Sequence, residues 1–150
     1  MPITIRRIER GDEDEWARMR LALWPEFDPQ NHRSDMEDYF ANPYTKGVFV
    51  AACPEGALGG FLEASIRPFA EGCETPFPVG YIEGWYVDAD WRQQGVGAQM
   101  VHAAEDWARS LGCREMASDC DLTNQVSARS HLALGYEEAA RLIHFRKSLI

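Results

Sequence analysis

The sequence lacks the patterns that mark metal-binding, disulfide-bonded and membrane-spanning proteins. Its 150 residues include only four cysteines, which form neither a C-x-x-C pair nor a zinc-like group with the four histidines. No apolar run approaches the roughly 20 residues that a membrane-spanning helix requires, and the first residues do not resemble a secretory signal. We therefore expect reduced, mostly structural thiols, no bound metal, no membrane partner and a cytoplasmic location.

An excess of positive charge is also missing. The formal net charge is −9, with 24 acidic side chains against 15 basic ones. Because an acidic surface repels nucleic-acid backbones, we expect no nucleic-acid partner. The same charge suits a cationic substrate, since a cleft of one sign concentrates ions of the opposite sign. With 45% hydrophobic residues, the chain is long enough to form a single domain over residues 1–150.

Two helices are predicted after a first strand at residues 3–8. Asp12 fits a capping-box-like start for the first helix, and Pro25 ends that helix. Ser34 is predicted to begin the second helix, because a glutamate follows it at capping-box spacing. The second helix is expected to end near the Asn-Pro pair at residues 42–43.

The rest of the chain alternates further strands with two more helices. A hairpin is expected around the turn at residues 54–56, and glycines at positions 112 and 135 close the two helices. The strands are expected at residues 47–53, 60–68, 81–87, 115–121, 136–141 and 142–148, and the helices at 96–111 and 126–134. The resulting order βααβββαβαββ predicts an α/β protein with a mixed central β-sheet flanked by helices.

The most informative stretch covers residues 80–98, where a strand is followed by a glycine-bearing loop that opens directly into a helix. Gly95 and Gly97 let this loop curl and let a phosphate approach the main chain, and a helix N-terminus favours anions. The loop lacks the Gly-Lys-Ser/Thr end of a Walker loop, and Met100 stands where a dinucleotide fingerprint has its third glycine. We interpret it as a pyrophosphate cradle; an ordinary tight turn is the alternative for the glycines alone.

Arg92-x-x-Gly95-x-Gly97 after the strand ending at Val87 resembles the coenzyme A signature of the GCN5-related N-acetyltransferases, the GNAT superfamily. This resemblance implies the GNAT-like fold and acetyl-coenzyme A (acetyl-CoA) as the cosubstrate, without a metal. The strand, loop and helix pattern expected from the residues themselves agrees with that fold.

A second run, Asn124-x-x-Ser127-x-x-x-His131, is similar to the other cofactor segment of this superfamily. Relatives commonly carry a tyrosine seven residues after the asparagine, where it is thought to protonate the departing thiolate. Here that position is His131. Because a coenzyme A thiol has a pKa of roughly 8.5, an imidazole could protonate it, or an acid could be unnecessary. His131 is thus a candidate catalytic acid, while a purely structural role for a lone helix histidine stays open.

Further segments along nearly the whole chain resemble the aminoglycoside 6'-N-acetyltransferases of Gram-negative bacteria. They are Leu23-Trp24-Pro25, Glu63-Ala-Ser-Ile-Arg67, Ile82-Glu83-Gly84, Glu115-Met-Ala-Ser-Asp119 and Phe145-Arg-Lys147. This resemblance implies direct transfer, in a ternary complex, of an acetyl group from acetyl-CoA to the 6'-amine of a deoxystreptamine antibiotic. It also implies antibiotic resistance and, as in relatives, a homodimer.

The resemblance assigns site residues as well. The main chain of Trp85, Tyr86 and Val87 would pair with the pantetheine arm as an added strand. The remaining cofactor contacts would come from Gln93, Gln94, Gly95, Val96, Gly97, Ala98 and Asn124. The substrate contacts would come from Trp24, Phe27, Glu83 and Asp119.

Glu83 and Asp119 are the candidate proton acceptors. Both are predicted in neighbouring central strands, where an unpaired buried carboxylate is costly unless it serves a ligand or an ion pair. A solvent-exposed position for Glu83 is the alternative. Because a carboxylate beside an ammonium ion also stabilises the charged form, the sequence does not separate a binding role from a base role.

Two other functions fit parts of the same pattern. A GNAT enzyme that acetylates a polyamine, a metabolite or a protein amine would share the cofactor site and differ only in the substrate cleft. A non-catalytic coenzyme A-binding module would keep the fold, and His131 in place of the usual tyrosine is the feature that favours it.

Replacing Asp119 by asparagine tests its assigned role. We expect Asp119→Asn to leave acetyl-CoA affinity nearly intact and to lower turnover of kanamycin-type substrates about tenfold or more, because the proton acceptor is lost. Steady-state kinetics and acetyl-CoA calorimetry on the same preparation measure the two effects. Unaltered turnover would remove Asp119 from the mechanism.

Overall fold

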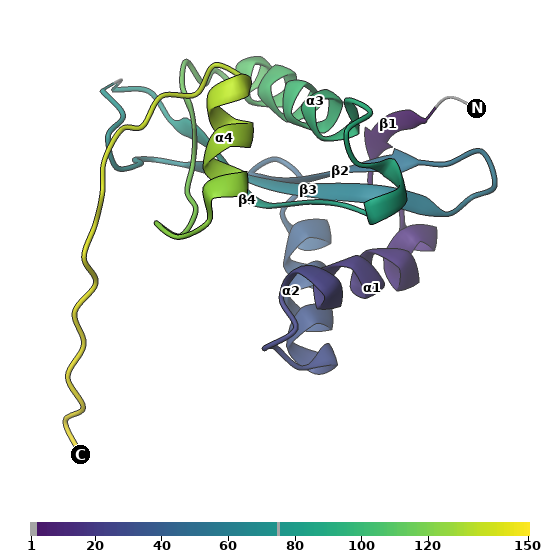
Figure 1. Cartoon of the computed structure of the whole chain (residues 1–150), viewed down its shortest axis with the longest axis horizontal. Helices are drawn as coiled ribbons and strands as arrows, with labels where there is room; N and C mark the ends of the chain where they lie inside the picture. The colour runs from purple at the N-terminus through teal and green to yellow at the C-terminus, as the bar shows by residue number, and fades with distance from the viewer. Residues whose placement is uncertain (1–2, 75) are drawn as a thin grey trace.

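The computed structural model describes residues 3–74 and 76–150, which form one mixed sheet with helices on both faces (Figure 1). The strands are β1 (Thr4–Arg7), β2 (Lys46–Ala52), β3 (Leu58–Arg67), β4 (Val79–Val87) and β5 (Met116–Ser118). The helices are α1 (Glu13–Leu23), α2 (Pro29–Ala41), α3 (Val96–Ser110) and α4 (Gln125–Ala133), with short 3-10 turns η1 (Arg10–Asp12) and η2 (Ala89–Trp91). The predicted fold class is confirmed for these elements.

The five strands follow one another across the sheet in chain order. The pairs β1–β2, β2–β3 and β3–β4 are antiparallel, and β4–β5 is parallel. The parallel pair covers only three positions, from Gly80 opposite Met116 to Ile82 opposite Ser118. Beyond Ile82, β4 continues to Val87 without a β5 partner, so the two strands part in the middle of the sheet.

The two faces of the sheet bury separate clusters of apolar side chains. In the view of Figure 1, α3 lies on one face, and α1 with α2 covers the other. Successive residues of β3 point to opposite faces. Leu62 packs with Met100 and Ala104 of α3, whereas Phe61 packs with Trp16 of α1 on the other side. Both faces of β3 are therefore buried, which explains its nearly continuous apolar sequence.

The first helix begins where predicted, and the second does not. Asp12 is the N-cap residue of α1, but its side chain makes no cap bond; its carboxylate accepts hydrogen bonds from Arg6, at 2.7 and 3.0 Å, and from the Glu9 amide, at 2.9 Å. The second helix begins at Pro29, five residues before the predicted Ser34. Asp28 caps it by accepting the Asn31 amide at 2.8 Å. Proline suits a first helical position and aspartate a cap, and this signal outweighs the later capping box.

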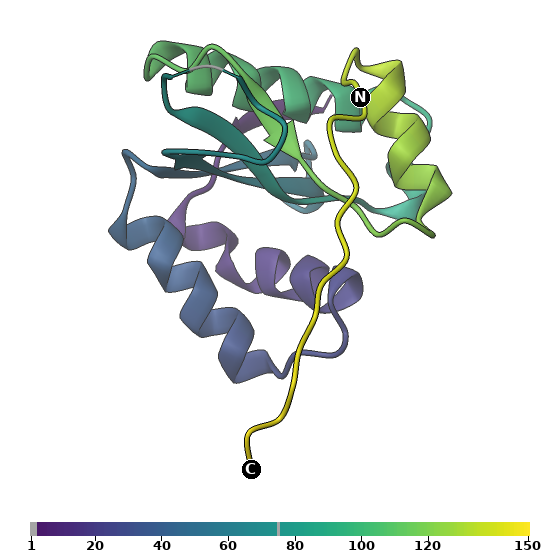
Figure 2. The same ribbon diagram turned by 90° about the vertical axis from the view of Figure 1, so that its left-hand side faces the viewer.

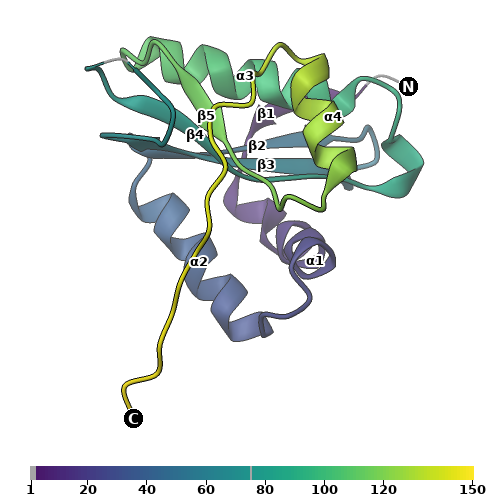
Figure 3. The same cartoon turned by 60° about the vertical axis from the view of Figure 1, so that its left-hand side comes forward.

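The two final strands predicted at residues 136–141 and 142–148 are not formed. Residues 136–150 have no helix or strand; Tyr136 still packs against the core, and the C-terminal part of the segment extends away from the domain (Figures 1 and 3). A strand exists only with a hydrogen-bonded neighbour, and this segment lies beside none. The observed order is therefore βααβββαβα. The predicted strand at 115–121 is also shorter, because β5 ends at Ser118 where β4 diverges.

All four cysteines are free, with Cys53 and Cys113 buried and Cys120 exposed. Among the described residues, none of the helices combines the length and apolar content needed to cross a bilayer. The same residues contain no cluster of His, Cys, Asp and Glu side chains arranged to hold a metal ion.

Candidate active site

The main chain of β4 beyond Ile82 offers an open strand edge on the side of β5, the last strand of the sheet. Its other edge is paired with β3, up to Val87 opposite Gly60. On the side of β5, the chain turns away after Ser118 toward α4, which lies beyond the gap (Figure 3). Trp85, Tyr86 and Val87 therefore lie where an extended, amide-containing ligand can add as a further strand.

The loop before α3 presents a run of free main-chain donors. Within the described chain, the N–H groups of residues 93–98 donate to no other residue, whereas Gln99 already bonds to the Gly95 carbonyl at 3.1 Å. Gly95 caps the helix in the left-handed conformation, with φ 79°, and Gln93 shares that unusual region with φ 61°. Backbone amides gathered in this way at a helix N-terminus form an anion site.

Close packing holds this loop against β4. A Cβ atom added to Gly97 would lie only 3.1 Å from the indole nitrogen of Trp85, so a larger residue would push the loop and the strand apart. Arg92 closes the other end, because its Nε donates to the Val87 carbonyl at 2.8 Å. The cradle and the open strand edge are thus in direct contact with each other.

His131 faces the gap from α4, held between Trp85 and Tyr136 with ring centroids 5.4 and 5.8 Å away. Its Nδ1 lies 2.7 Å from the Ser127 carbonyl, and its Nε2 lies 2.8 Å from the Ser118 hydroxyl. A carbonyl only accepts hydrogen bonds, so Nδ1 carries the proton of the neutral ring, and Nε2 accepts from Ser118. Asn124 caps α4 by accepting the Ser127 amide at 3.1 Å.

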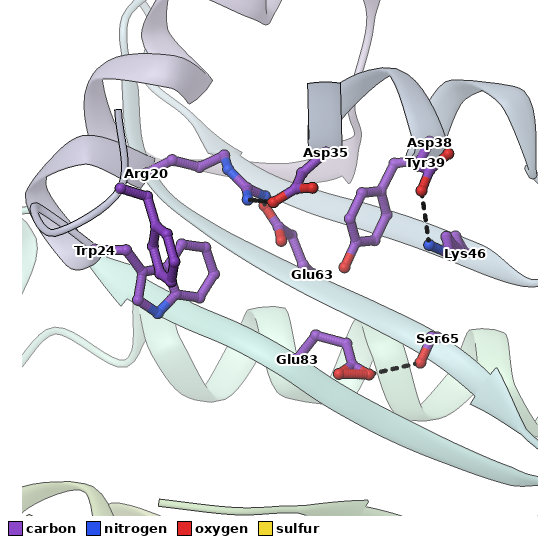
Figure 4. Close-up of a pocket in the computed structure, with 10 residues that line it drawn as sticks. Arg20, Trp24, Asp35, Asp38, Tyr39, Lys46, Glu63, Ser65 and Glu83 are labelled. Carbon is purple, nitrogen blue, oxygen red and sulfur yellow. Dashed lines mark hydrogen bonds and ion pairs between the residues drawn. The ribbon is translucent and has the colours of Figure 1, made fainter. Parts of the chain in front are cut away.

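A cavity of about 330 Å³ opens on the α1–α2 side of the sheet (Figure 4). It is lined by Arg20, Trp24, Phe27, Asp35, Asp38, Tyr39, Lys46, Glu63, Ser65 and Glu83. Four carboxylates face two cationic side chains, so the cavity carries a net negative charge that attracts cations. Trp24 lies directly over Gly84, where an added Cβ would come within 2.4 Å of the indole ring.

The floor of this cavity is a buried ion pair that the sequence analysis did not identify. Glu63 accepts hydrogen bonds from Arg20 and from the indole N–H of Trp16, at 2.8 Å from the latter. Burial raises the pKa of Glu63, and Arg20, Trp16 and Tyr39 act against that rise. Arg20 also contacts His32 and Asp35, so one guanidinium joins α1, α2 and β3. In the sequence, the only sign of this ion pair was Glu63 itself, a charged residue inside a mostly apolar strand.

The two predicted proton acceptors lie in one connected network. Arg67 donates to both oxygens of Glu83, at 2.6 and 2.7 Å, and Ser65 donates to the same carboxylate at 2.8 Å. The Arg67 guanidinium stacks on Tyr81, 3.5 Å from the ring centroid, and the Tyr81 hydroxyl donates to Asp119. Burial, together with the bond to Asp119, raises the pKa of Tyr81 and keeps its hydroxyl protonated.

The residues assigned to the substrate from the sequence lie in two places. Trp24, Phe27 and Glu83 line the acidic cavity. Asp119 does not line it, and reaches Glu83 only through Tyr81 and Arg67. Four further lining residues were not predicted, because their positions depend on how α1 and α2 lie on the sheet: Arg20, Asp35, Tyr39 and Glu63.

Comparison with known proteins identifies the class of protein. Residues 16–136 match the model of the acetyltransferase (GNAT) family, and the chain belongs to this family. The chain is 44% identical to an aminoglycoside N(6')-acetyltransferase type 1 of Klebsiella aerogenes, over 97% of this chain and 96% of that one. It is 39% identical to a protein of the same description from Serratia marcescens, over 91% and 92%.

Solved structures give the same result for the fold. The structure of AAC(6')-Iy in complex with the bisubstrate analogue CoA-S-monomethyl-acetylneamine has a TM-score of 0.92 and 36% identity, covering 99% of both chains. The structure of AAC(6')-Ih from Acinetobacter baumannii has a TM-score of 0.90 and 31% identity, covering 98% of this chain and 99% of that one. The resemblance to aminoglycoside 6'-N-acetyltransferases drawn from the sequence is thereby confirmed.

The buried Arg20–Glu63 pair provides a stability test. Arg20→Met leaves a buried carboxylate without its cation, which we expect to lower the free energy of unfolding by about 3–5 kcal/mol at pH 7. Urea unfolding measures this loss.

Adding Glu63→Gln to Arg20→Met should recover most of the loss, because the amide oxygen still accepts from Trp16. The loss in free energy of unfolding of Arg20→Met should become smaller toward pH 4.5. The pKa of Glu63 is raised in the folded state, so its protonation stabilises that state below the unfolded pKa, and this contribution is lost as the pH rises. Arg109→Met, which removes an exposed pair on α3, is the matched control. Equal stability of Arg20→Met and the unaltered protein would contradict this assignment.

Proposed function

We propose that the protein is an aminoglycoside 6'-N-acetyltransferase that moves an acetyl group from acetyl-CoA to a cationic antibiotic and so confers resistance. One observation carries the proposal. Glu83, which lines the acidic cavity, directly follows Ile82, the last β4 residue paired with β5. A cation held at Glu83 therefore meets the open strand edge on which a pantetheine arm would end. The names of the relatives support the same substrate class.

The free donors of the structure fit the cosubstrate. The amides of residues 93–98 suit a pyrophosphate, and the main chain of residues 85–87 suits the amides of pantetheine. Asn124 and the N-terminus of α4 border the same gap. When bound, acetyl-CoA supplies the activated thioester; this chain supplies the donors that hold it.

Trp24 and Phe27 would lie against a sugar ring, while the carboxylates of the cavity would hold ammonium groups. The amine must lose a proton before it attacks. An alkyl ammonium with a pKa of roughly 10 is about one part in a thousand free base at neutral pH, so deprotonation costs on the order of 4 kcal/mol. Neighbouring ammonium groups lower that cost. We propose Glu83 or Asp119, directly or through a water, as the proton acceptor.

The amine then attacks the thioester directly, and a main-chain N–H of residues 85–87 steadies the developing oxyanion. Holding both reactants in one geometry supplies much of the acceleration. We propose His131 as the acid for the departing thiolate. For this step the ring must carry a second proton, on Nε2; the imidazolium would then donate to the Ser118 hydroxyl, which in turn would donate its own proton to the thiolate.

A panel of amines tests the proposal. The protein with acetyl-CoA should release coenzyme A with neomycin, kanamycin or tobramycin and give a product acetylated at the 6'-amine by NMR, because Trp24 and Phe27 offer a sugar ring an apolar surface beside the carboxylates. Spermidine and a lysine peptide are the comparison amines.

Acetylation of spermidine but not of any aminoglycoside would favour the metabolite or protein acetyltransferase. Coenzyme A binding without release from any amine would favour the non-catalytic module. Expression in a susceptible host should raise the concentration of kanamycin needed to stop growth.

We further propose a homodimer, formed in the cytoplasm, where the four free cysteines stay reduced. The extended segment 136–150 exposes Leu142, Ile143 and Phe145, at 54, 79 and 89%. Such a patch of apolar side chains marks an interaction surface. β5 is also an edge strand with one free side, which a second chain can pair.

Light scattering of the full chain should give twice the mass of one chain, and a variant that ends at residue 140 should be monomeric, because the apolar segment is lost. This truncation keeps Ala139, which packs against Gly72. Phe145→Asp in the full chain is a milder version of the same change. A full chain that runs as a monomer would contradict the proposal.

A further inference from the structure

The carboxylate that faces the cavity is already paired with a cation of the protein itself. Two nitrogens of Arg67 reach Glu83, with Nη2 2.6 and 2.7 Å from its two oxygens and Nε 3.2 Å from one of them. Ser65 donates to the same group. In the free protein Glu83 therefore has a cationic partner where the proposed substrate would bring its own.

The two arginine–glutamate pairs of this site differ in burial. Arg20 and Glu63 leave only 5 and 3% of their side chains exposed, so no ligand can replace either partner without opening the core. Arg67 and Glu83 leave 41 and 26% exposed, and a pair of that kind contributes little net stability. The first pair is fixed by burial, whereas the second can exchange its cation.

Arg67 has a second contact that remains when it leaves Glu83. Its guanidinium stacks on Tyr81, and that contact does not depend on the carboxylate. Arg67 stands at the end of β3 and does not itself line the cavity, whereas Glu83 does. A cation that enters the cavity thus approaches Glu83 without first meeting Arg67.

We propose that Arg67 is the counter-ion of Glu83 in the free protein, and that the reacting ammonium group must displace Arg67 to reach Glu83. The cost of this displacement lowers the affinity for every amine, and only polycations offset it with further contacts. The inference rests on the proposed function. A singly charged amine exchanges one ion pair for another and gains little. A polycation makes additional contacts with other carboxylates, such as Asp35 and Asp38 on α2, which offset the displacement.

Calorimetry on the full protein saturated with coenzyme A tests this displacement. Neomycin, which carries the 6'-amine, should bind Arg67→Met about three- to fivefold more tightly than the unaltered protein, since the competing pair is gone. Paromomycin, which carries a hydroxyl in place of that amine, should change less than about twofold, because it brings no ammonium group to Glu83. Arg67→Lys keeps the positive charge but lacks the forked donors of the guanidinium, so its neomycin affinity should lie between those of Arg67→Met and the unaltered protein.

Two controls separate displacement from other effects. Arg109→Met removes one positive charge from an exposed pair on α3 and should leave neomycin affinity unchanged, which excludes a mere effect of net charge. The ¹⁵N NMR signal of Arg67 Nε–H, identified by its loss in Arg67→Met, should shift when neomycin is added and stay in place with paromomycin.

The outcomes distinguish this inference from the proposed function. Weaker neomycin binding by Arg67→Met would make Arg67 a positioning residue for Glu83 and overturn the displacement, as would equal gains for both antibiotics. Binding without acetylation would overturn the proposed function. The role of Arg67 would then still be decided by the ratio of neomycin affinities of Arg67→Met and the unaltered protein. Absence of neomycin binding to either protein would overturn both.

Discussion

The separation of β4 from β5 is the constraint on which the site depends. Main-chain groups of a central strand are normally paired on both sides, and here the pairing with β5 stops at Ile82 and Ser118. A second set of free donors, the amides of residues 93–98, follows within a few residues because η2 and the glycine loop turn the chain directly into α3. The view in Figure 2 shows how α3 and α4 border this part of the sheet. The chain belongs to the acetyltransferase family, and these unpaired groups are the ones that we propose hold acetyl-CoA.

The two arginine–glutamate pairs at the cavity differ in how deeply they are buried. The fixed pair of Arg20 and Glu63 ties two helices to the sheet, so the cavity keeps its shape while it stays acidic. The exposed pair of Arg67 and Glu83 leaves a carboxylate available to a stronger or more numerous set of cations. The overall negative charge of the chain acts at longer range, and it brings polycations near the cavity without deciding which group they contact.

Local sequence signals predicted most of the elements, and they failed where a partner was needed. Helical spacing, turn glycines and alternating strands all act between near neighbours in the chain, so β1 to β4, α3 and α4 were found within a few residues of their bounds. Asp28 and Pro29 were as strong a helix start as Ser34, and the sequence analysis chose the wrong one. Two strands were predicted within residues 136–150, yet a strand forms only against a neighbour, and none of the described strands pairs with this segment.

The site divides in the same way. The glycine-bearing loop could be predicted from the sequence, because Gly95, Gly97 and the helix start act through the main chain of one continuous segment. The cavity could not be predicted, since Arg20, Tyr39 and Glu63 come from three elements that meet only when α1 and α2 cover the sheet. The sequence by itself determined where a loop opens into a helix N-terminus, because that depends on residues adjacent in the chain. Only the tertiary structure decided the pairing of each carboxylate, because ion pairs depend on distances between residues far apart in the chain.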